Sequence, residues 1–265
     1  MIVCLAANPS IDKLFEVERL VRGDIHRPLG FEQTAGGKGL NVARAARALG
    51  ADVQVVALLR GHAGKWLEET LSSEGVGGSF VWTHGENRSS LSVADRETAG
   101  LTEFYEHGSE VPAAAWPELA HAAARSFPEA SWLTISGSVP SGIEDTAYRD
   151  IVAEARAAGV GVALDAEGDM LRLALEAGPD VVKVNASEAA GLLGVPTGRR
   201  DEALAAAQKL RELAGGDDHV GIVTRGADGV VLAAPSASRR ASAQPAPRSS
   251  PTANPARNAS PLPTG

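Results

Sequence analysis

The stretch AGGKGLNVARAARALG, residues 35–50, joins a glycine-rich turn to a helical pattern and places a glycine–lysine pair at the start of that helix. Such a pair is typical of a phosphate site, because the N-terminus of a helix favours negative charge. The nucleotide P-loop pattern, G-x-x-x-x-G-K followed by Ser or Thr, does not fit, because Gly39 follows Lys38. The phosphate that this stretch would bind therefore needs another explanation.

Around this stretch, short apolar runs alternate with longer helical patterns, which is typical of a parallel sheet covered by helices. The apolar runs predict strands at 2–7, 53–59, 131–136, 160–165, 180–185 and 219–224. The helical periodicity predicts helices at 37–49, 63–73, 112–127, 144–158 and 168–177, and two more up to residue 214. We therefore expect an α/β fold with a doubly wound, mainly parallel sheet.

Between residues 79 and 106 the period falls to two, and the segments SFVWT, SSLSVAD and LTEFYE are separated by turn residues. A piece at about 14–34, which contains RPLGFEQT, has the same character. The segments between residues 79 and 106 predict antiparallel strands, and together with the earlier piece they predict a small β-sheet. We expect this small sheet to lie over one end of the main sheet as a lid.

The bulk composition excludes several classes of protein. The 265 residues are 44% hydrophobic and carry a formal charge of -8, which allows one sizeable core and argues against a nucleic-acid partner. The single cysteine, Cys4, lies in an apolar run and can form no internal disulfide. The first apolar run has no basic region before it and stops at Asn8 and Pro9, and no run is long enough to span a membrane. We therefore expect a cytoplasmic protein without a membrane partner.

Polar and glycine residues follow the predicted strands, at the edge where open parallel sheets bind their ligands. Asn8, Pro9 and Asp12 follow the first strand, GSVPSG follows SWLTIS, and Asp165 ends VGVALD. KVNASE ends the next strand, and TRGADG follows HVGIVT. The six histidines show no metal-ligand spacing with one another or with Cys4. The functional site is therefore expected at this edge of the sheet and without a histidine base.

Five motifs in order make the chain resemble a known family. They are NPSID, the G-G-x-G-x-N pattern at 36–41, GSVPSG, the N-x-x-E pair Asn185 and Glu188, and the T-x-G turn at Thr224 and Gly226. With these motifs, residues 1–234 resemble the carbohydrate kinases of the ribokinase-like (PfkB) fold. NPSIDK, NRSS and LTEFYEHG look most like the 1-phosphofructokinase and tagatose-6-phosphate kinase branch, which phosphorylates sugar phosphates.

The resemblance answers the question of whose phosphate lies near the glycine-rich helix start. In this branch that helix start faces the sugar, so the phosphate would be the acceptor's own. Gly36 and Gly37 lack side chains, which lets backbone amides approach an oxygen closely. Taken alone, the two glycines could also form nothing more than a strand-to-helix turn.

The resemblance also implies side chains that would bind the sugar phosphate. Asp12 and Asn41 would bind sugar hydroxyls. Arg88, in the lid, would clamp the phosphate together with Lys38 and Arg27. From the residues alone, Asp12 could instead be a loop or capping residue, and Arg88 a solvated turn arginine.

The same resemblance places ATP at the ends of the later strands. Lys183 would approach the transferring phosphate, and Thr224 with Gly226 would contact the nucleotide. Magnesium carried by ATP would lie near Asn185 and Glu188, held through waters and phosphate oxygens. Two plainer roles stay open: Lys183 as a strand-end lysine, and Asn185 with Glu188 as a helix capping box.

One motif of the family is absent from the sequence. Phosphoryl transfer to an alcohol uses a base beside the hydroxyl, which this family supplies with a G-A-G-D sequence at the start of a late helix. The nearest match, GADG at 226–229, lacks the second glycine before Asp228 and runs directly into VVLAA. We therefore interpret Asp228 as a turn residue and assign no catalytic base.

The composition changes at residue 235. Residues 235–265 hold 7 of the 15 prolines, with 6 Ser, 7 Ala and 4 Arg, and contain no acidic or aromatic residue. Such a segment buries too little apolar surface to fold. We therefore expect a kinase domain at 1–234 that is incomplete at its C-terminus, followed by a disordered tail, and we suspect a frame error in the gene or its record.

The expected function is an ATP-dependent phosphotransferase that acts on an alcohol group of a sugar phosphate of the fructose 1-phosphate or tagatose 6-phosphate type, with Mg²⁺. The alternative is an inactive, truncated or frameshifted family member that retains at most sugar-phosphate binding. Loss of the base alone would lower the rate by about 10² to 10⁴. We also expect that the lid could pair two chains as a homodimer.

Overall fold

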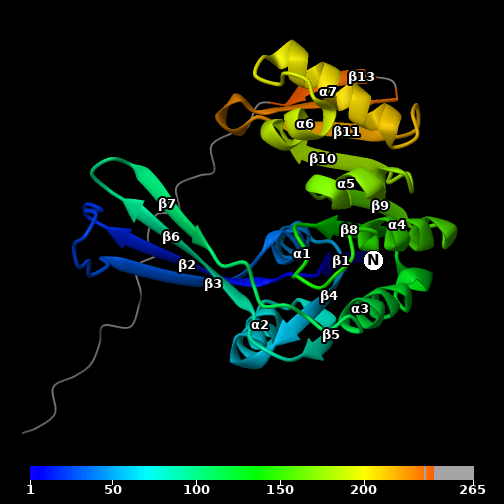
Figure 1. Ribbon diagram of the computed structural model, residues 1–265. Helices are drawn as coiled ribbons and strands as arrows, with labels where there is room; N and C mark the ends of the chain where they lie inside the picture. The colour runs from blue at the N-terminus through cyan, green and yellow to red at the C-terminus, as the bar shows by residue number, and fades with distance from the viewer. Residues whose placement is uncertain (236, 242–265) are drawn as a thin grey trace, which may run out of the picture.

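In the computed structural model, residues 1–235 and 237–241 are described, and they form a main sheet from which a smaller sheet projects (Figure 1). The main-sheet strands are β1 (Ile2–Ala6), β4 (Val53–Arg60), β5 (Gly77–Thr83), β8 (Trp132–Ser136), β9 (Gly161–Asp165), β10 (Val181–Asn185), β11 (Val220–Thr224), β12 (Val230–Ala234) and β13 (Ala237–Ala241). Their order across the sheet is β13-β12-β11-β10-β9-β8-β1-β4-β5. All neighbours from β5 to β11 pair in parallel, which confirms the predicted doubly wound, mainly parallel sheet.

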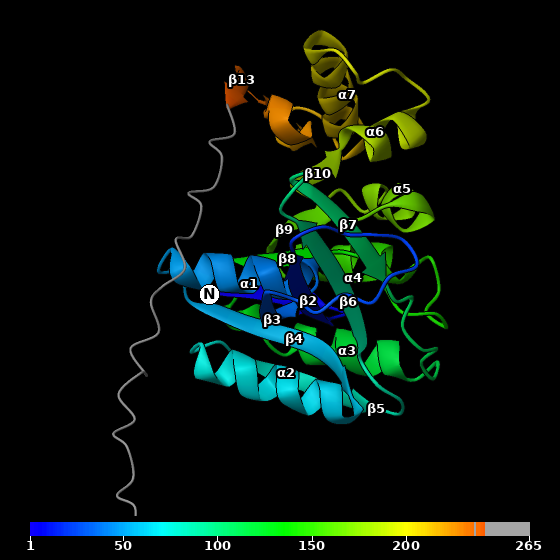
Figure 2. The ribbon, with the colours of Figure 1, turned by 90° about the vertical axis from the view of Figure 1, so that its left-hand side faces the viewer.

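Helices cover the main sheet on two faces (Figures 1 and 2). They are α1 (Lys38–Ala48), α2 (Gly61–Ser73), α3 (Ala115–Ala124), α4 (Ala147–Ala157), α5 (Gly168–Leu175), α6 (Ala186–Leu193) and α7 (Arg200–Leu213), with 3-10 turns η1 (Phe127–Glu129) and η2 (Gly226–Asp228). Helices α1 and α2 pack on one face, and α3 to α7 on the other, which gives two hydrophobic cores. Among the described residues, no helix combines the length and the apolar character needed to cross a membrane.

The glycine-rich stretch 35–50 fits tightly against the first strand. Gly37 precedes α1 with φ of 88°, a conformation that glycine adopts at little cost. A Cβ on Gly39 would lie 2.7 Å from the carbonyl oxygen of Leu5 and 2.8 Å from the Cβ of Ala6. Only glycine therefore lets α1 approach β1 this closely, and this contact sets the start of the helix at the carboxyl end of β1.

The smaller sheet is the predicted lid, with some boundaries corrected. Its strands are β2 (Ser10–Val17), β3 (Gly30–Gly36), β6 (Arg88–Asp95) and β7 (Gly100–Tyr105), in the order β3-β2-β6-β7. Strands β2 and β6 pair in parallel, and the two outer pairs are antiparallel. The expectation that SFVWT belongs to the lid is wrong, because these residues form β5, which pairs in parallel with β4 and contacts α3.

The C-terminal boundary of the folded region also differs from the expectation. Residues 237–241, within the segment expected to be a disordered tail, form β13, which pairs antiparallel with β12. A β-ladder is held by backbone hydrogen bonds, so an edge strand can form without the apolar side chains that a core requires. Position 236 and residues 242–265 lie outside the described residues.

Candidate active site

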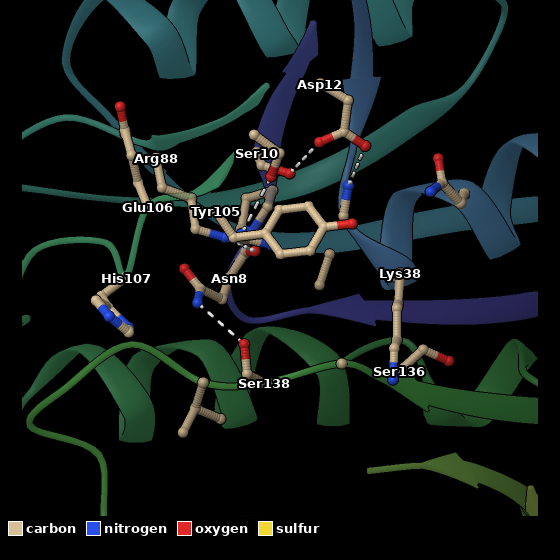
Figure 3. A pocket seen from close by; sticks show the side chains of 18 of the residues that line it. Asn8, Ser10, Asp12, Lys38, Arg88, Tyr105, Glu106, His107, Ser136 and Ser138 are labelled. Carbon is tan, nitrogen blue, oxygen red and sulfur yellow. Dashed lines mark hydrogen bonds between the residues drawn. The ribbon is translucent and has the colours of Figure 1, made fainter. Parts of the chain in front are cut away.

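A cavity of about 780 Å³ lies at the carboxyl ends of the central strands, between the main sheet and the lid (Figure 3). It is lined by the ends of β1, β8 and β10, by the start of α1 and by the lid strands β2, β6 and β7. Strand β1 lies at a topological switch point of the sheet, because β4 and β5 follow on one side of it and β8 and the later strands on the other. Open α/β sheets bind ligands at such switch points.

The carboxylate of Asp12 is held in place at the junction of the lid with α1. The Ser10 hydroxyl donates to one carboxylate oxygen of Asp12 at 2.6 Å, and the Gly37 amide donates to the other at 3.3 Å. A Cβ on Gly36 would collide with this carboxylate, so Gly36 provides the space that Asp12 occupies. Asp12 lies within strand β2 rather than in a loop or a cap, and it lines the cavity.

The N-terminus of α1 opens into the same cavity. Gly37, Lys38, Gly39 and Asn41 all line it. The helix has no side-chain cap and no acidic residue in its first turn. Its first backbone N–H groups and the positive end of its dipole are therefore available to oxygen atoms or anions in the cavity.

Arg88 lies at the lid end of the cavity. Its Nε donates to the Asn8 carbonyl oxygen at 3.3 Å and its Nη1 to the Ser90 hydroxyl at 3.3 Å. The Asn8 side chain in turn donates to the Ser138 hydroxyl at 3.2 Å, which links the first strand to the GSVPSG turn (Figure 3). No carboxylate pairs with Arg88 in the described part of the chain. Arg27 is exposed in the β2–β3 connection and does not line the cavity.

Lys38 does not stand beside Arg88 but on the other side of Asn8, next to Ser136 (Figure 3). Its Nζ lies 3.3 Å from a carboxylate oxygen of Asp165 and 3.6 Å from one of Glu188. Burial disfavours its charge, but the two carboxylates outweigh this effect and raise the pKa of Lys38.

Lys183 joins the same network through Asp165. Its Nζ donates to the second carboxylate oxygen of Asp165 at 2.6 Å. Asp165 therefore bridges two lysines that come from α1 and β10. Neither Lys183 nor Asp165 lines the cavity, whereas Lys38 does.

Asn185 and Glu188 form a helix capping box and also line the cavity. The backbone amide of Glu188 donates to Asn185 Oδ1 at 2.8 Å, and the backbone amide of Asn185 donates to Glu188 Oε2 at 2.7 Å. The capping interpretation is confirmed, yet Glu188 Oε1 remains directed to Lys38. Within the described ranges, no group of three or more His, Cys, Asp or Glu side chains could hold a metal ion alone. A magnesium ion here would need waters and phosphate oxygens besides Glu188, which fits its preference for oxygen ligands.

Thr224 ends β11 and Gly226 follows it, and both lie beside the cavity rather than in its lining. Thr224 lies next to Asn185 in the β10–β11 register, and its hydroxyl donates to the Val184 carbonyl oxygen at 3.4 Å. Asp228 lies in the turn η2 and is exposed, with its carboxylate 3.5 Å from Arg225. Its position agrees with the interpretation of GADG as a turn.

Several lining residues were not predicted from the sequence. Tyr105, Glu106 and His107 come from the end of β7 and the segment after it, and Ser136 comes from the end of β8. The lid residues lie near Asp12 because of the strand register, in which Asp12 pairs with Ser90 and Ser90 with Tyr105. No local pattern reports such a register, whereas the position of Ser136 at a predicted strand end was a usable indication.

Comparison with known proteins places this geometry in a family. Residues 4–250 match the pfkB family of carbohydrate kinases, a range that extends past residue 234. A 1-phosphofructokinase from Haloferax volcanii is 34% identical over 233 residues, covering 88% of this chain and 73% of that protein. A tagatose-6-phosphate kinase from Staphylococcus epidermidis is 31% identical over 195 residues, covering 73% of this chain and 62% of that protein, less than two thirds of its length.

The fold is shared with solved structures. The structure of the tetrameric inhibited form of phosphofructokinase-2 from Escherichia coli superposes with a TM-score of 0.81 at 23% identity, over 91% of this chain and 79% of that chain. At this identity the likeness concerns the fold, and it agrees with the expected ribokinase-like architecture. Because the family match covers most of the sequence, the chain belongs to the pfkB family of carbohydrate kinases.

Proposed function

We propose that this chain is an ATP-dependent kinase that phosphorylates an alcohol group of a sugar phosphate of the fructose 1-phosphate or tagatose 6-phosphate type. The observation that carries the proposal is the polarity of the cavity. Arg88, which forms no ion pair with a carboxylate of the described residues, lies at its lid end, and the Lys38–Asp165–Glu188 network lies across Asn8 from it. A sugar phosphate that spans the cavity would place its own phosphate at Arg88 and its reacting hydroxyl toward Lys38.

The sugar ring would bind between these two ends. The Asp12 carboxylate already accepts two hydrogen bonds, from Ser10 and Gly37, and its remaining lone pairs can accept from sugar hydroxyls. Asn41, exposed on α1 and lining the cavity, can both donate and accept. The free N–H groups at the start of α1 would face the oxygen at which negative charge develops.

The nucleotide would approach from the ends of β10 and β11. Thr224 and Gly226 would contact ATP there, with Lys183 near its phosphates and magnesium held between the phosphates and Glu188. Catalysis of phosphoryl transfer consists largely of positioning and of stabilising charge on the transferring group. Lys38 is suited to that task because its raised pKa keeps it charged. The alternative of an inactive binding protein gains no support from the comparisons, in which the named relatives are kinases.

Direct binding and turnover measurements test this proposal. Fructose 1-phosphate, tagatose 6-phosphate and fructose 6-phosphate should bind more tightly than fructose or ribose. The expected difference in affinity is at least tenfold, which corresponds to about 1.4 kcal/mol. Arg88→Met should abolish this preference, whereas Arg96→Met, which removes an exposed arginine paired with Glu16, should preserve it. Equal or tighter binding of the neutral sugars would refute the sugar-phosphate assignment. Tight binding without phosphoryl transfer from ATP would favour the inactive alternative.

The lid also supports a proposal about assembly. Phe31, Leu101 and Phe104 are more than half exposed on it, at 55%, 57% and 58%. Exposed aromatic and aliphatic side chains gathered on one small sheet are typical of an interaction surface. We propose that two copies of the chain pair through their lids. Light scattering should report a dimer, and Phe31→Ser with Phe104→Ser should shift it to a monomer.

A further inference from the structure

Arg60, at the end of β4, is buried without an opposite charge. Its side chain is fully buried, at 0% exposure, and no carboxylate pairs with it in the described part of the chain. Its Nη1 donates to the Ser109 carbonyl oxygen at 2.8 Å, but Nε and Nη2 have no hydrogen-bond partner. Burial lowers the pKa of Arg60, although an arginine side chain stays charged in proteins. An unpaired buried cation is costly, so its position calls for an explanation.

Arg60 lies beneath the segment that leads from the lid back to the main body. This segment, residues 106–110, connects β7 to the region before α3 and has no regular secondary structure. Gly108 within it has φ of 76°. A Cβ on Gly108 would lie 3.3 Å from Asn8 Oδ1, 3.6 Å from Arg60 Nη2 and 3.7 Å from Arg88 Cδ. Three polar side chains therefore converge under Gly108, at the lid end of the cavity.

Two of these three side chains reach the cavity directly. Asn8 and Arg88 line it, together with His107 from the covering segment (Figure 3). Asn8 Oδ1 is, like the two nitrogens of Arg60, buried and without a hydrogen-bond partner. The lid end of the cavity thus has one guanidinium in its lining and a second guanidinium behind it, and no carboxylate of the described residues forms an ion pair with either.

We propose that Arg60 is a positioning residue for the phosphate group of the sugar substrate. The buried positive charge of Arg60 attracts this phosphate from behind Arg88 and Asn8. This inference rests on the proposed function. The Glu106 carboxylate also lines this end of the cavity, where it accepts from the Ser89 backbone amide at 2.7 Å. Two neighbouring cations without an ion pair among the described residues repel each other, and a bound dianionic phosphate would relieve that repulsion. Because Arg60 is shielded from water, salt screens its charge less than it screens an exposed charge. Its Nη1 also donates to the Ser109 carbonyl oxygen, which links Arg60 to the covering segment 106–110.

This role predicts a separation between affinity and rate. Arg60 does not line the cavity and does not touch the reacting atoms, so its loss should raise the KM for the sugar phosphate and leave kcat nearly unchanged. The affinity for a neutral sugar and for ATP should also stay the same, because neither places an anion at this end. A merely structural arginine would instead change all of these quantities together.

The experiment compares three variants of the whole chain with the wild type. Arg60→Met should weaken fructose 1-phosphate binding by about tenfold or more, equivalent to about 1.4 kcal/mol. Arg60→Lys, which keeps the charge, should restore most of the affinity. Arg156→Met removes the same charge from an ion pair with Asp180, far from the cavity, and should leave the affinity unchanged. Thermal unfolding of each variant is measured alongside, and Arg60→Gln replaces Arg60→Met if the latter does not fold.

The outcomes separate this inference from the proposed function. If the wild type binds sugar phosphates no better than neutral sugars, the proposed function fails first. If the wild type shows the preference and folded Arg60→Met or Arg60→Gln keeps it in full, the role of Arg60 is refuted. It is equally refuted if both classes of sugar lose affinity to the same extent, because that result describes a structural residue.

Discussion

The two halves of the main sheet differ in how their strands are covered. In the first half, β1 and β4 are buried over nearly their whole length, because α1 and α2 cover one face and α3 the other. In the second half, buried and half-buried residues alternate along β10, β11 and β12. Their buried side chains face α6 and α7. The half-buried apolar residues on the opposite face include Val181, Ile222 and Leu232.

This difference separates the two ends of the proposed active site. The sugar end lies where both faces of the sheet are covered, and there Asp12, Ser10 and Gly37 form a closely fitted set of hydrogen bonds. The proposed nucleotide residues are Thr224, which ends β11, and Gly226, which follows it. Helices cover this strand on one face, and both residues lie outside the cavity lining. The described residues therefore form a hydrogen-bonded lining at the sugar end, whereas the residues proposed for the nucleotide end do not line the cavity.

The largest expected effect tests the sugar end. Asp12→Ala and Asn41→Ala should each weaken sugar-phosphate binding by about 1 to 3 kcal/mol, because each leaves sugar hydroxyls without partners in the cavity. ATP affinity should stay unchanged, and thermal stability should change much less than affinity. Calorimetric titration with each ligand and thermal unfolding measure the three quantities.

Thr224→Ala is the matched control from the other half. It should weaken ATP binding and leave sugar-phosphate binding unchanged, because Thr224 does not line the sugar cavity. If Asp12→Ala instead lowers stability strongly at unchanged sugar affinity, Asp12 has a structural role at the lid junction. If Thr224→Ala weakens both ligands equally, the two ends of the site are not separate.

The sequence predicted the parts of the structure that depend on neighbouring residues. Apart from the placement of SFVWT and the unexpected strand β13, the strands, the helices and the glycine-rich start of α1 follow from local periodicity and turn chemistry, and the structure confirms them. The roles of Gly36 and Gly39 are only partly local. Their motif is visible in the sequence, but glycine is required at Gly36 by the nearby Asp12 carboxylate and at Gly39 by the close contact with β1.

What the sequence could not predict depends on contacts between distant segments. The segment SFVWT forms the edge strand β5, in which Phe80 and Val81 are half-buried and Trp82 is exposed, so its local pattern does not distinguish it from a lid strand. Arg60 ends the apolar run VQVVALLR and gives no local indication of burial. The bridge from Asp165 to two lysines joins residues 127 and 18 positions apart, so only the folded chain brings them together.

A second prediction tests the difference in covering with adjacent valines. Val55 and Val56 are both fully buried on β4, so Val55→Ala and Val56→Ala should each lower the free energy of unfolding by about 2 kcal/mol. On β12 the two neighbours should differ. Val231→Ala, at a position that faces α7, should cost nearly as much, whereas Val230→Ala, at the half-buried position, should cost less than about 1 kcal/mol. Urea denaturation measures all four.

Equal costs for Val230→Ala and Val231→Ala would break the comparison. Both faces of β12 would then be covered in solution, either by residues outside the described ranges or by another chain. Repeating the measurement at several protein concentrations distinguishes these cases, because only a contact between chains makes the stability depend on concentration.

The smallest expected effect concerns Lys38, which connects the two halves by reaching from α1 to Asp165 on β9 and to Glu188 on α6. Lys38→Met should lower the free energy of unfolding by less than about 1 kcal/mol, because the Lys38 side chain is 46% exposed and its ion pairs are screened.

This small effect should depend on pH. Burial opposes the charge of Lys38, but the two carboxylates raise the pKa of Lys38 above its ordinary value. A lysine whose pKa is higher in the folded state stabilises the folded state fully at pH values below its unfolded-state pKa of about 10.4. This stabilisation is lost as the pH rises through the folded-state pKa. The difference in stability between wild type and Lys38→Met should therefore be constant between about pH 6 and pH 9 and should disappear as the pH rises through the folded-state pKa of Lys38. Lys65→Met, which removes an exposed lysine on α2, controls for the loss of one charge. A difference that is the same for both variants at every pH would show that the network around Asp165 does not stabilise the join between the two halves.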